Sequence, residues 1–155
     1  MEFASLVEQH SRIINKVSYF YATETMPFDD LRQEIYVNIW QSLSQFRGDS
    51  KMSTWIYRVA VSAALMTLRS SRRKVETVPY DVGLLDISSE IDDAQKENLQ
   101  TLRTLIDRLE AMEKAIILLW LDEYSYEDIA ETLGLKRNTV ATKIHRIKDK
   151  LSKSI

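Results

Sequence analysis

Apolar residues recur at helical spacing in three successive stretches of the N-terminal half of the chain. The first stretch ends before Pro27, and Asp29 and Asp30 then supply a new helix start. The second stretch continues until residues 47–49 interrupt it, and Ser53 can cap the third. Three helices of this size predict one small domain. Its apolar stripes are Leu6, Ile13, Val17, Phe20 and Tyr21; Leu31, Ile35, Ile39, Leu43 and Phe46; and Ile56, Val59, Ala60 and Ala63.

The helical periodicity fails after Lys74, where Pro79 and Gly83 appear and acidic residues accumulate. This composition is typical of a linker. Helical periodicity returns near Leu99 and continues through Trp120. The pattern therefore predicts an all-α protein with two small helical domains, over residues 1–74 and 98–155, joined by an acidic linker over 75–97.

The end of the chain has the pattern of a helix-turn-helix. Residues 125–128 have the form of a capping box, and Gly134 stands where a helix C-terminus favours glycine. A basic helix follows, with the apolar stripe Val140, Ile144, Ile147 and Leu151. In a helix-turn-helix the first helix braces the second, whose N-terminal turns enter the DNA major groove. An ordinary helical hairpin with a hydrated basic face is the alternative.

The apolar stripe fixes which side of this last helix faces outward. At about 100° per residue, Asn138, Thr142 and His145 point most directly away from the stripe, with Arg146 beside them. We expect these side chains to meet bases. The basic residues that flank this face and suit DNA phosphates are Lys136, Arg137, Lys143 and Lys148.

Composition removes several other classes of protein. The 155 residues include three Gly, two Pro and no Cys, which disfavours a many-stranded β-sandwich or barrel. The only two histidines, His10 and His145, lie far apart, so we expect no metal site and no cofactor. No apolar run approaches the ~18 residues of a membrane span, and the N-terminus lacks the basic region of a signal peptide, which predicts a cytoplasmic protein. No nucleophile–base set or phosphate loop is visible, so we expect no enzyme.

Charge is distributed unevenly along the chain, although the net charge is only −2. Residues 47–74 hold seven basic residues and one acidic residue, a net charge of +6, whereas residues 75–97 hold seven acidic residues and one basic residue. After Gly134, seven basic residues face only Asp149. Two basic segments in an acidic remainder indicate two contacts with a polyanion, and two hydrated helix ends are the simpler alternative.

Three groups of residues then occur together in a familiar order. They are Asp30-Leu-Arg-Gln-Glu-Ile-Tyr-Val-Asn-Ile-Trp40; Phe46-Arg-Gly-Asp49 with Ser53-Thr-Trp-Ile-Tyr-Arg58; and Ser125-Tyr-Glu-Asp-Ile-Ala130 with Thr139-Val140 and His145-Arg146. With these groups the chain resembles an extracytoplasmic-function (ECF) sigma factor, a compact member of the sigma-70 family, over nearly its whole length. The resemblance implies a protein without catalytic activity that binds core RNA polymerase and directs promoter recognition and transcription initiation through sigma regions 2 and 4.

The resemblance also implies roles for particular residues. The helix that begins near Asp30 would dock on a coiled coil of the largest polymerase subunit through Asp30, Gln33, Glu34, Tyr36, Val37 and Trp40. The third helix would contact and help to open the minus-ten element through Trp55, Arg58, Ser62, Leu65, Arg69, Arg72 and Arg73. The helix-turn-helix would read the minus-thirty-five element through Lys136, Arg137, Asn138, Thr139, Thr142, Lys143, His145 and Arg146. On the simpler alternatives, Asp30 and Gln33 only cap their helix, and Trp40 and Trp55 only fill the core.

The chain departs from the family pattern at four places. Val61-Ser62 stand where the family usually has Arg-Asn, and Met66 stands where it has an acid, which predicts a shallower and more apolar site for a minus-ten base. Glu110 replaces a proline common before the helix-turn-helix, and Ala141 replaces a frequent lysine of the recognition helix. The loss of that lysine weakens a phosphate contact without changing the fold.

The implied partners are core RNA polymerase, promoter DNA and an anti-sigma factor, which in this family is typically membrane-bound. The rival interpretation is a stand-alone helix-turn-helix transcriptional regulator that uses its N-terminal domain to sense or to dimerise. Such regulators generally dimerise so that two recognition helices lie one DNA turn apart. The sequence has no separate dimerisation heptad, so we expect a monomer when the protein is free.

Overall fold

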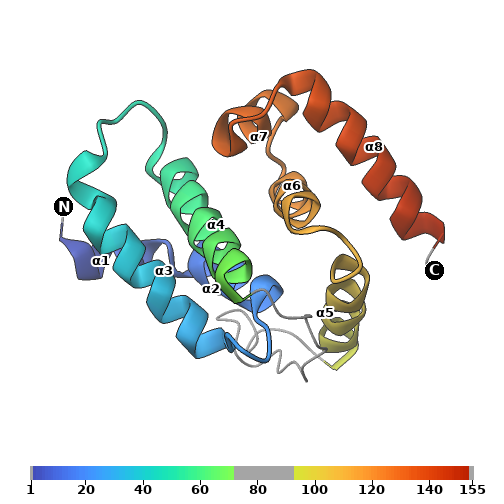
Figure 1. Ribbon diagram of the computed structural model, residues 1–155, viewed down its shortest axis with the longest axis horizontal. Helices are drawn as coiled ribbons and strands as arrows, with labels where there is room; N and C mark the ends of the chain where they lie inside the picture. Colours follow the sequence, from blue (N-terminus) through green and yellow to red (C-terminus); the bar gives the residue numbers. More distant parts are fainter. Residues whose placement is uncertain (1, 72–92, 154–155) are drawn as a thin grey trace. The chain divides into compact units, whose positions relative to one another are not determined.

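The computed structural model describes residues 2–71 and 93–153, and its regular secondary structure in these ranges is entirely helical (Figure 1). This confirms the predicted all-α class. The chain divides into two compact units, Met1–Gln100 and Thr101–Ile155. The helices are α1 (Phe3–Gln9), α2 (Ser11–Tyr21), α3 (Phe28–Ser42), the 3₁₀ turn η1 (Leu43–Gln45), α4 (Met52–Ser71), α5 (Asp93–Ile106), α6 (Ala111–Leu121), α7 (Tyr126–Leu133) and α8 (Arg137–Lys153).

The N-terminal unit is built on the mutual packing of α2, α3 and α4. Each of these helices buries apolar positions, but the buried side of α2 and α4 is wider than the predicted stripe, since Asn15, Ser18 and Val61 are also buried. Ile13 and Val59 of the predicted stripes are only partly buried. The opposite side of α3 stays exposed, which leaves the predicted docking residues outside the core. The fully or almost fully buried side chains of the three helices include Ile14, Val17, Phe20, Leu31, Ile35, Ile39, Ile56, Tyr57, Ala60 and Ala64.

Several predicted helix boundaries are wrong. The first predicted helix is two helices, because His10 leaves the helical conformation (φ −115°, ψ 19°) between α1 and α2. Pro27 is the N-cap of α3, and Asp29 and Asp30 lie in the first turn, where their charges face the positive end of the helix dipole. Ser53 does not cap α4, which already begins at Met52.

The predicted linker differs from the structure at its C-terminal end. Helix α5 begins at Asp93, so residues 93–97 are helical. Asp93 therefore belongs to the first turn of a helix, where negative charge is favourable. The remainder of the predicted linker, together with Arg72 and Arg73, lies outside the described residues.

The C-terminal unit is a helix-turn-helix braced by α6. Helices α6, α7 and α8 pack against one another, and Val140, Ile144 and Ile147 of α8 are buried, as the stripe predicts. The hydroxyl of Ser125 accepts a hydrogen bond from the Asp128 amide at 3.1 Å, which caps α7. Gly134 ends α7 in the left-handed conformation (φ 70°), and the structure confirms the helix-turn-helix.

We expect Gly134→Ala to lower the free energy of unfolding by about 1–2 kcal/mol, since an L-residue is strained at this φ. An added Cβ would meet nothing within 4 Å, so steric clash adds nothing to this cost. Glu123 has φ 66° at the end of α6, and Glu123→Gly is expected to shift stability in the opposite direction. Urea unfolding followed by circular dichroism checks both. Equal stability of Gly134→Ala and the parent chain would contradict the prediction.

Candidate nucleic-acid interface and docking surface

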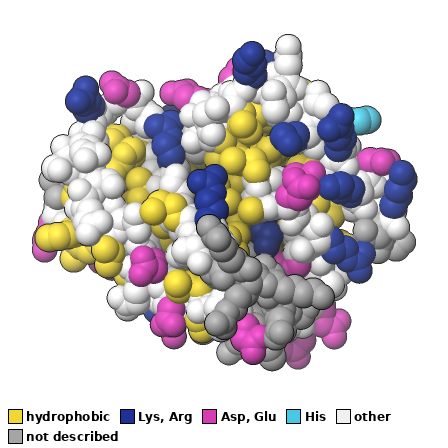
Figure 2. All heavy atoms as spheres, viewed as in Figure 1, with side chains coloured by type: hydrophobic (Ala, Val, Ile, Leu, Met, Phe, Trp, Pro, Cys, Tyr) yellow, Lys and Arg dark blue, Asp and Glu magenta, His cyan; other side chains and the backbone are white. Residues whose placement is uncertain are grey.

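Helix α8 presents the predicted recognition face to solvent. Asn138, Thr142, His145 and Arg146 are exposed, and Thr139 and Lys143 are partly buried beside them. The buried stripe of the same helix lies on the opposite side. Figure 2 shows Lys and Arg side chains gathered over α8. The orientation of the helix is therefore as predicted, and the base contacts of these residues stay predictions.

Two of the basic side chains predicted to contact phosphate already have partners in the protein. Arg137 Nε donates to Glu127 Oε1 at 2.6 Å, and its guanidinium lies 5.6 Å from the centroid of the Tyr126 ring. Lys148 Nζ lies 4.3 Å from the centroid of the Trp120 ring, within the range of a cation–π interaction. The sequence does not predict either contact, because each joins two different helices: α7 and α8 for Arg137, and α6 and α8 for Lys148.

Glu113 ties the start of α6 to the far half of α8. Its buried carboxylate accepts hydrogen bonds from Lys150 Nζ at 3.0 and 3.1 Å and from the Glu110 amide at 3.1 Å. Burial by itself raises the pKa of Glu113, but the hydrogen bonds from Glu110 and Lys150 and the charges of Lys150 and Lys143 outweigh it and lower that pKa. A proline at position 110 lacks the N–H that Glu110 donates, so this departure from the family pattern creates a helix cap.

We expect Glu113→Gln to lower the free energy of unfolding by about 1–2 kcal/mol at pH 7, because a charged hydrogen-bond acceptor is lost. The pKa of Glu113 is lower in the folded protein, so its stabilisation is present above the unfolded pKa of about 4.3 and disappears as pH falls through the folded pKa. The two proteins should converge in stability at acidic pH. Urea unfolding at several pH values measures this. Asp149→Asn, which breaks an exposed pair with Lys153, is the control and should cost less.

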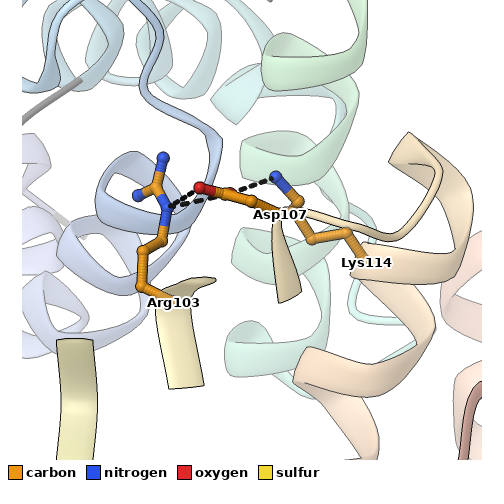
Figure 3. A network of polar contacts seen from close by, with 3 residues as sticks. All are labelled: Arg103, Asp107 and Lys114. Carbon is orange, nitrogen blue, oxygen red and sulfur yellow. Dashed lines mark hydrogen bonds and ion pairs between the residues drawn. The ribbon is translucent and has the colours of Figure 1, made fainter. Parts of the chain in front are cut away.

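A second ionic cluster joins the end of α5 to the start of α6 (Figure 3). Arg103 Nε donates to both carboxylate oxygens of Asp107, at 2.9 and 3.1 Å, and Lys114 Nζ donates to Asp107 Oδ1 at 3.2 Å. Burial is the main cause that lowers the pKa of Lys114, and Asp107 partly opposes it. Because the Arg103 side chain is only 1% exposed, the cluster supports the fold and is no candidate for a DNA contact.

One face of α3 combines acidic, polar and large apolar side chains in solvent. Asp30, Gln33 and Glu34 are exposed, and Val37 and Trp40 follow them on this face with 47% and 64% of their surface exposed. The alternative in which Trp40 only fills the core is therefore wrong. Exposed aromatic residues among polar neighbours are typical of hot spots in protein interfaces.

Tyr36 lies beside this face and is partly buried. The guanidinium of Arg32 is 6.0 Å from the centroid of its ring and forms an ion pair with Asp29 at 3.1 Å. Arg32 is also 5.1 Å from the centroid of the Phe28 ring. These contacts hold Tyr36 against the helix, so Trp40 is the more available of the two aromatic side chains.

Helix α4 exposes part of the predicted minus-ten surface. Ser62 and Arg69 are exposed, and Met66 is 59% exposed, while Arg58 and Leu65 are partly buried. Trp55 is also partly buried, with its ring centroid 5.3 Å from that of Phe46. Trp55 thus packs on the segment before α4 and keeps part of its surface exposed. Both alternatives, a contact with the minus-ten element and a place in the core, stay open for this residue.

The two helical units, one of them a basic helix-turn-helix, correspond to two regions of one family of transcription factors. The family model described as "Sigma-70 region 2" matches residues 6–74, and the family model described as "Sigma-70, region 4" matches residues 99–151. The chain belongs to the sigma-70 family and is an ECF sigma factor, a factor that directs promoter recognition by RNA polymerase. The resemblance seen in the sequence is confirmed, and the stand-alone regulator is not favoured.

Relatives span nearly the whole chain. The chain is 28% identical to the ECF RNA polymerase sigma-E factor of Haemophilus influenzae over 159 residues, which cover 94% of this chain and 84% of the relative. The factor of the same name from Escherichia coli K12 is also 28% identical, over 97% of this chain and 84% of the relative.

Two solved structures have the same fold. CnrH, in complex with the cytosolic domain of CnrY, is 21% identical with a TM-score of 0.68, over 97% of this chain and 85% of that chain. The sigma factor RpoE of Bartonella quintana, in complex with the anti-sigma factor NepR, is 18% identical with a TM-score of 0.71, over 97% and 94% of the two chains.

Helices long and apolar enough to cross a membrane do not occur in residues 2–71 and 93–153. The same ranges contain no group of three or more His, Cys, Asp or Glu side chains that could hold a metal ion.

Proposed function

We propose that this sigma factor docks on core RNA polymerase with α3, holds the minus-ten element with α4 and reads the minus-thirty-five element with α8. Region 2 corresponds to residues 1–74 and region 4 to residues 98–155, with residues 75–97 between them. The protein acts in the bacterial cytoplasm and has no catalytic activity of its own. The observation that carries the proposal is the outward, basic face of α8 opposite its buried stripe.

The regulatory partner we infer is an anti-sigma factor, anchored in the membrane. Two similar structures each hold a second protein, named in one case as an anti-sigma factor and in the other as a cytosolic domain. The exposed apolar side chains of α3 and α4 suit such a partner, because a protein that covers them excludes polymerase or DNA.

Run-off transcription with purified core polymerase on a genomic promoter library tests the function. We expect this chain to produce transcripts that core polymerase alone does not, from promoters that share one upstream and one downstream motif. Gel filtration with and without core polymerase distinguishes a sigma factor from a stand-alone regulator. A chain that dimerises, binds duplex DNA alone and ignores polymerase would be a stand-alone regulator.

The proposed role of α4 predicts that Arg69→Ala slows open-complex formation, because an unpaired strand is held through phosphate attraction at a basic groove. The loss should be smaller on a template with a pre-melted bubble, since unpairing has already taken place. Permanganate footprinting of unpaired thymines measures the opening. Arg12→Ala removes an equal charge from α2 and is the matched control. Normal melting by the Arg69 variant would contradict this role.

A further inference from the structure

The two helices of the helix-turn-helix carry opposite charge. Helix α7 holds Glu127, Asp128 and Glu131 and no basic residue, whereas α8 is strongly basic. In a helix-turn-helix the first helix crosses the DNA backbone while the second enters the major groove. The acidic side chains of α7 therefore lie on a helix that approaches DNA phosphates. Repulsion between these carboxylates and the phosphates weakens DNA binding.

One ion pair joins the N-terminal turns of these two helices. Glu127 Oε1 accepts from Arg137 Nε at 2.6 Å, although the side chains remain 64% and 55% exposed. The Tyr126 ring, 5.6 Å from the guanidinium, helps to hold Arg137 in this position. The hydrogen bond from Arg137 is the largest cause that lowers the pKa of Glu127, so the carboxylate is charged at neutral pH. The pair is thus formed and also accessible to a competing anion.

We propose that Glu127 competes with DNA phosphate for Arg137 and so weakens the binding of α8 to DNA that lacks the correct bases. The inference rests on the proposed role of α8 in reading DNA. A phosphate that approaches Arg137 must displace the carboxylate or share the guanidinium with it, and the two anions repel each other. Non-specific binding comes almost entirely from phosphate contacts, whereas specific binding also has base contacts. A penalty on one phosphate contact weakens both kinds of binding by the same free energy, and it is measured most directly on DNA without the correct bases, where no base contact adds to the affinity.

Salt-dependent binding of the full chain to a labelled duplex of mixed sequence tests the proposal. The duplex is free of any selected promoter motif, and fluorescence anisotropy gives the dissociation constant. Glu127→Gln should bind roughly threefold to fivefold more tightly at about 50 mM salt, and most of this gain should vanish at about 200 mM, because one released phosphate contact steepens the salt slope by about 0.9.

The Arg137→Ala background identifies the cause of the gain. If Glu127 acts through Arg137, Glu127→Gln should change nothing in that background. Asp128→Asn removes an equal, exposed charge one residue further along α7 and should give a clearly smaller gain. A gain that survives Arg137→Ala, or an equal gain from Asp128→Asn, would show a general charge effect and overturn the proposal.

Two other results would also overturn it. Weaker binding by Glu127→Gln would mean that Glu127 positions Arg137 for DNA instead of competing for it. If Lys143→Ala and Arg146→Ala both leave the duplex affinity unchanged, α8 is not the DNA-binding surface, and the proposed role of α8 fails with the inference. The first result leaves that role intact, so the two failures are distinguishable.

Discussion

Replacing Trp40 by alanine is expected to weaken binding to core RNA polymerase by about 2 kcal/mol or more, roughly a 30-fold rise in Kd. Trp40 is 64% exposed in the free chain, beside Val37 at 47%, so the variant loses little packing within the N-terminal unit. A large aromatic side chain that moves from water into an interface accounts for much of the binding energy of a typical hot spot. The affinity for core polymerase in the absence of DNA measures the effect.

The matched control is Met66→Ala. Met66 is an apolar side chain of similar exposure, 59%, but it belongs to α4 and is not one of the α3 residues of the proposed docking face. It should leave the affinity for core polymerase nearly unchanged. The pair Gln33→Ala and Glu34→Ala should also weaken docking, since both side chains are exposed on the same face of α3. A folded Trp40→Ala protein with an unchanged Kd, or an equal loss from Met66→Ala, would place the docking face elsewhere.

The outward faces of α3 and α8 could be predicted because both helices bury a regular stripe. Once Val140, Ile144 and Ile147 are assigned to the core, the geometry of the helix places Asn138 and Thr142 on the opposite side. On α3 the stripe Leu31, Ile35 and Ile39 is buried as predicted, whereas the sequence leaves open whether Trp40 fills the core, and the structure exposes it. Periodicity is a property of one helix, so it needs no knowledge of the tertiary structure.

The side-chain pairs could not be predicted, because they depend on how separate helices meet. Glu127 and Arg137 approach each other only through the turn that Gly134 allows, and Lys150 reaches Glu113 across the packing of α6 on α8. These pairs change the interpretation of the basic residues. Some of the basic side chains of α8 form ion pairs within the protein, so not all of its positive charge is available to DNA.

Two predictions of helix boundaries were wrong because the sequence pattern around them does not show where the helix begins or breaks. The break at His10 contains no glycine or proline, and the apolar positions continue on both sides of it, so the sequence gives no local sign of the break. At α4 the amide of Trp55 donates to the Lys51 carbonyl at 3.1 Å, which starts the helix ahead of Ser53. A serine whose side chain could cap a helix therefore does not mark the helix start when an earlier backbone carbonyl already accepts the first helical hydrogen bond.

Asn138→Ala is expected to weaken promoter binding by about 1–3 kcal/mol, roughly a 5-fold to 150-fold rise in Kd. The loss should occur only on promoters that keep the one upstream base pair that Asn138 reads. Asn138 is exposed in the first turn of α8, from which a recognition helix reaches base edges. An asparagine amide can donate to N7 and accept from the N6 amino group of one adenine, and alanine can do neither. The variant should therefore bind the parent promoter and a promoter substituted at that base pair with similar affinity.

Lys136→Ala provides the contrast that separates base reading from charge. Lys136 is exposed at the N-terminal end of the same helix, and a phosphate contact there should weaken all sequences alike and reduce the salt slope by about 1. Lys148 is a poorer probe, because its ammonium lies over the Trp120 ring and its removal also changes packing. Holoenzyme binding to a set of singly substituted upstream elements measures both variants. If Asn138→Ala lowers affinity equally for every substituted element, Asn138 contacts the backbone, and base reading on α8 falls to Thr142, His145 and Arg146.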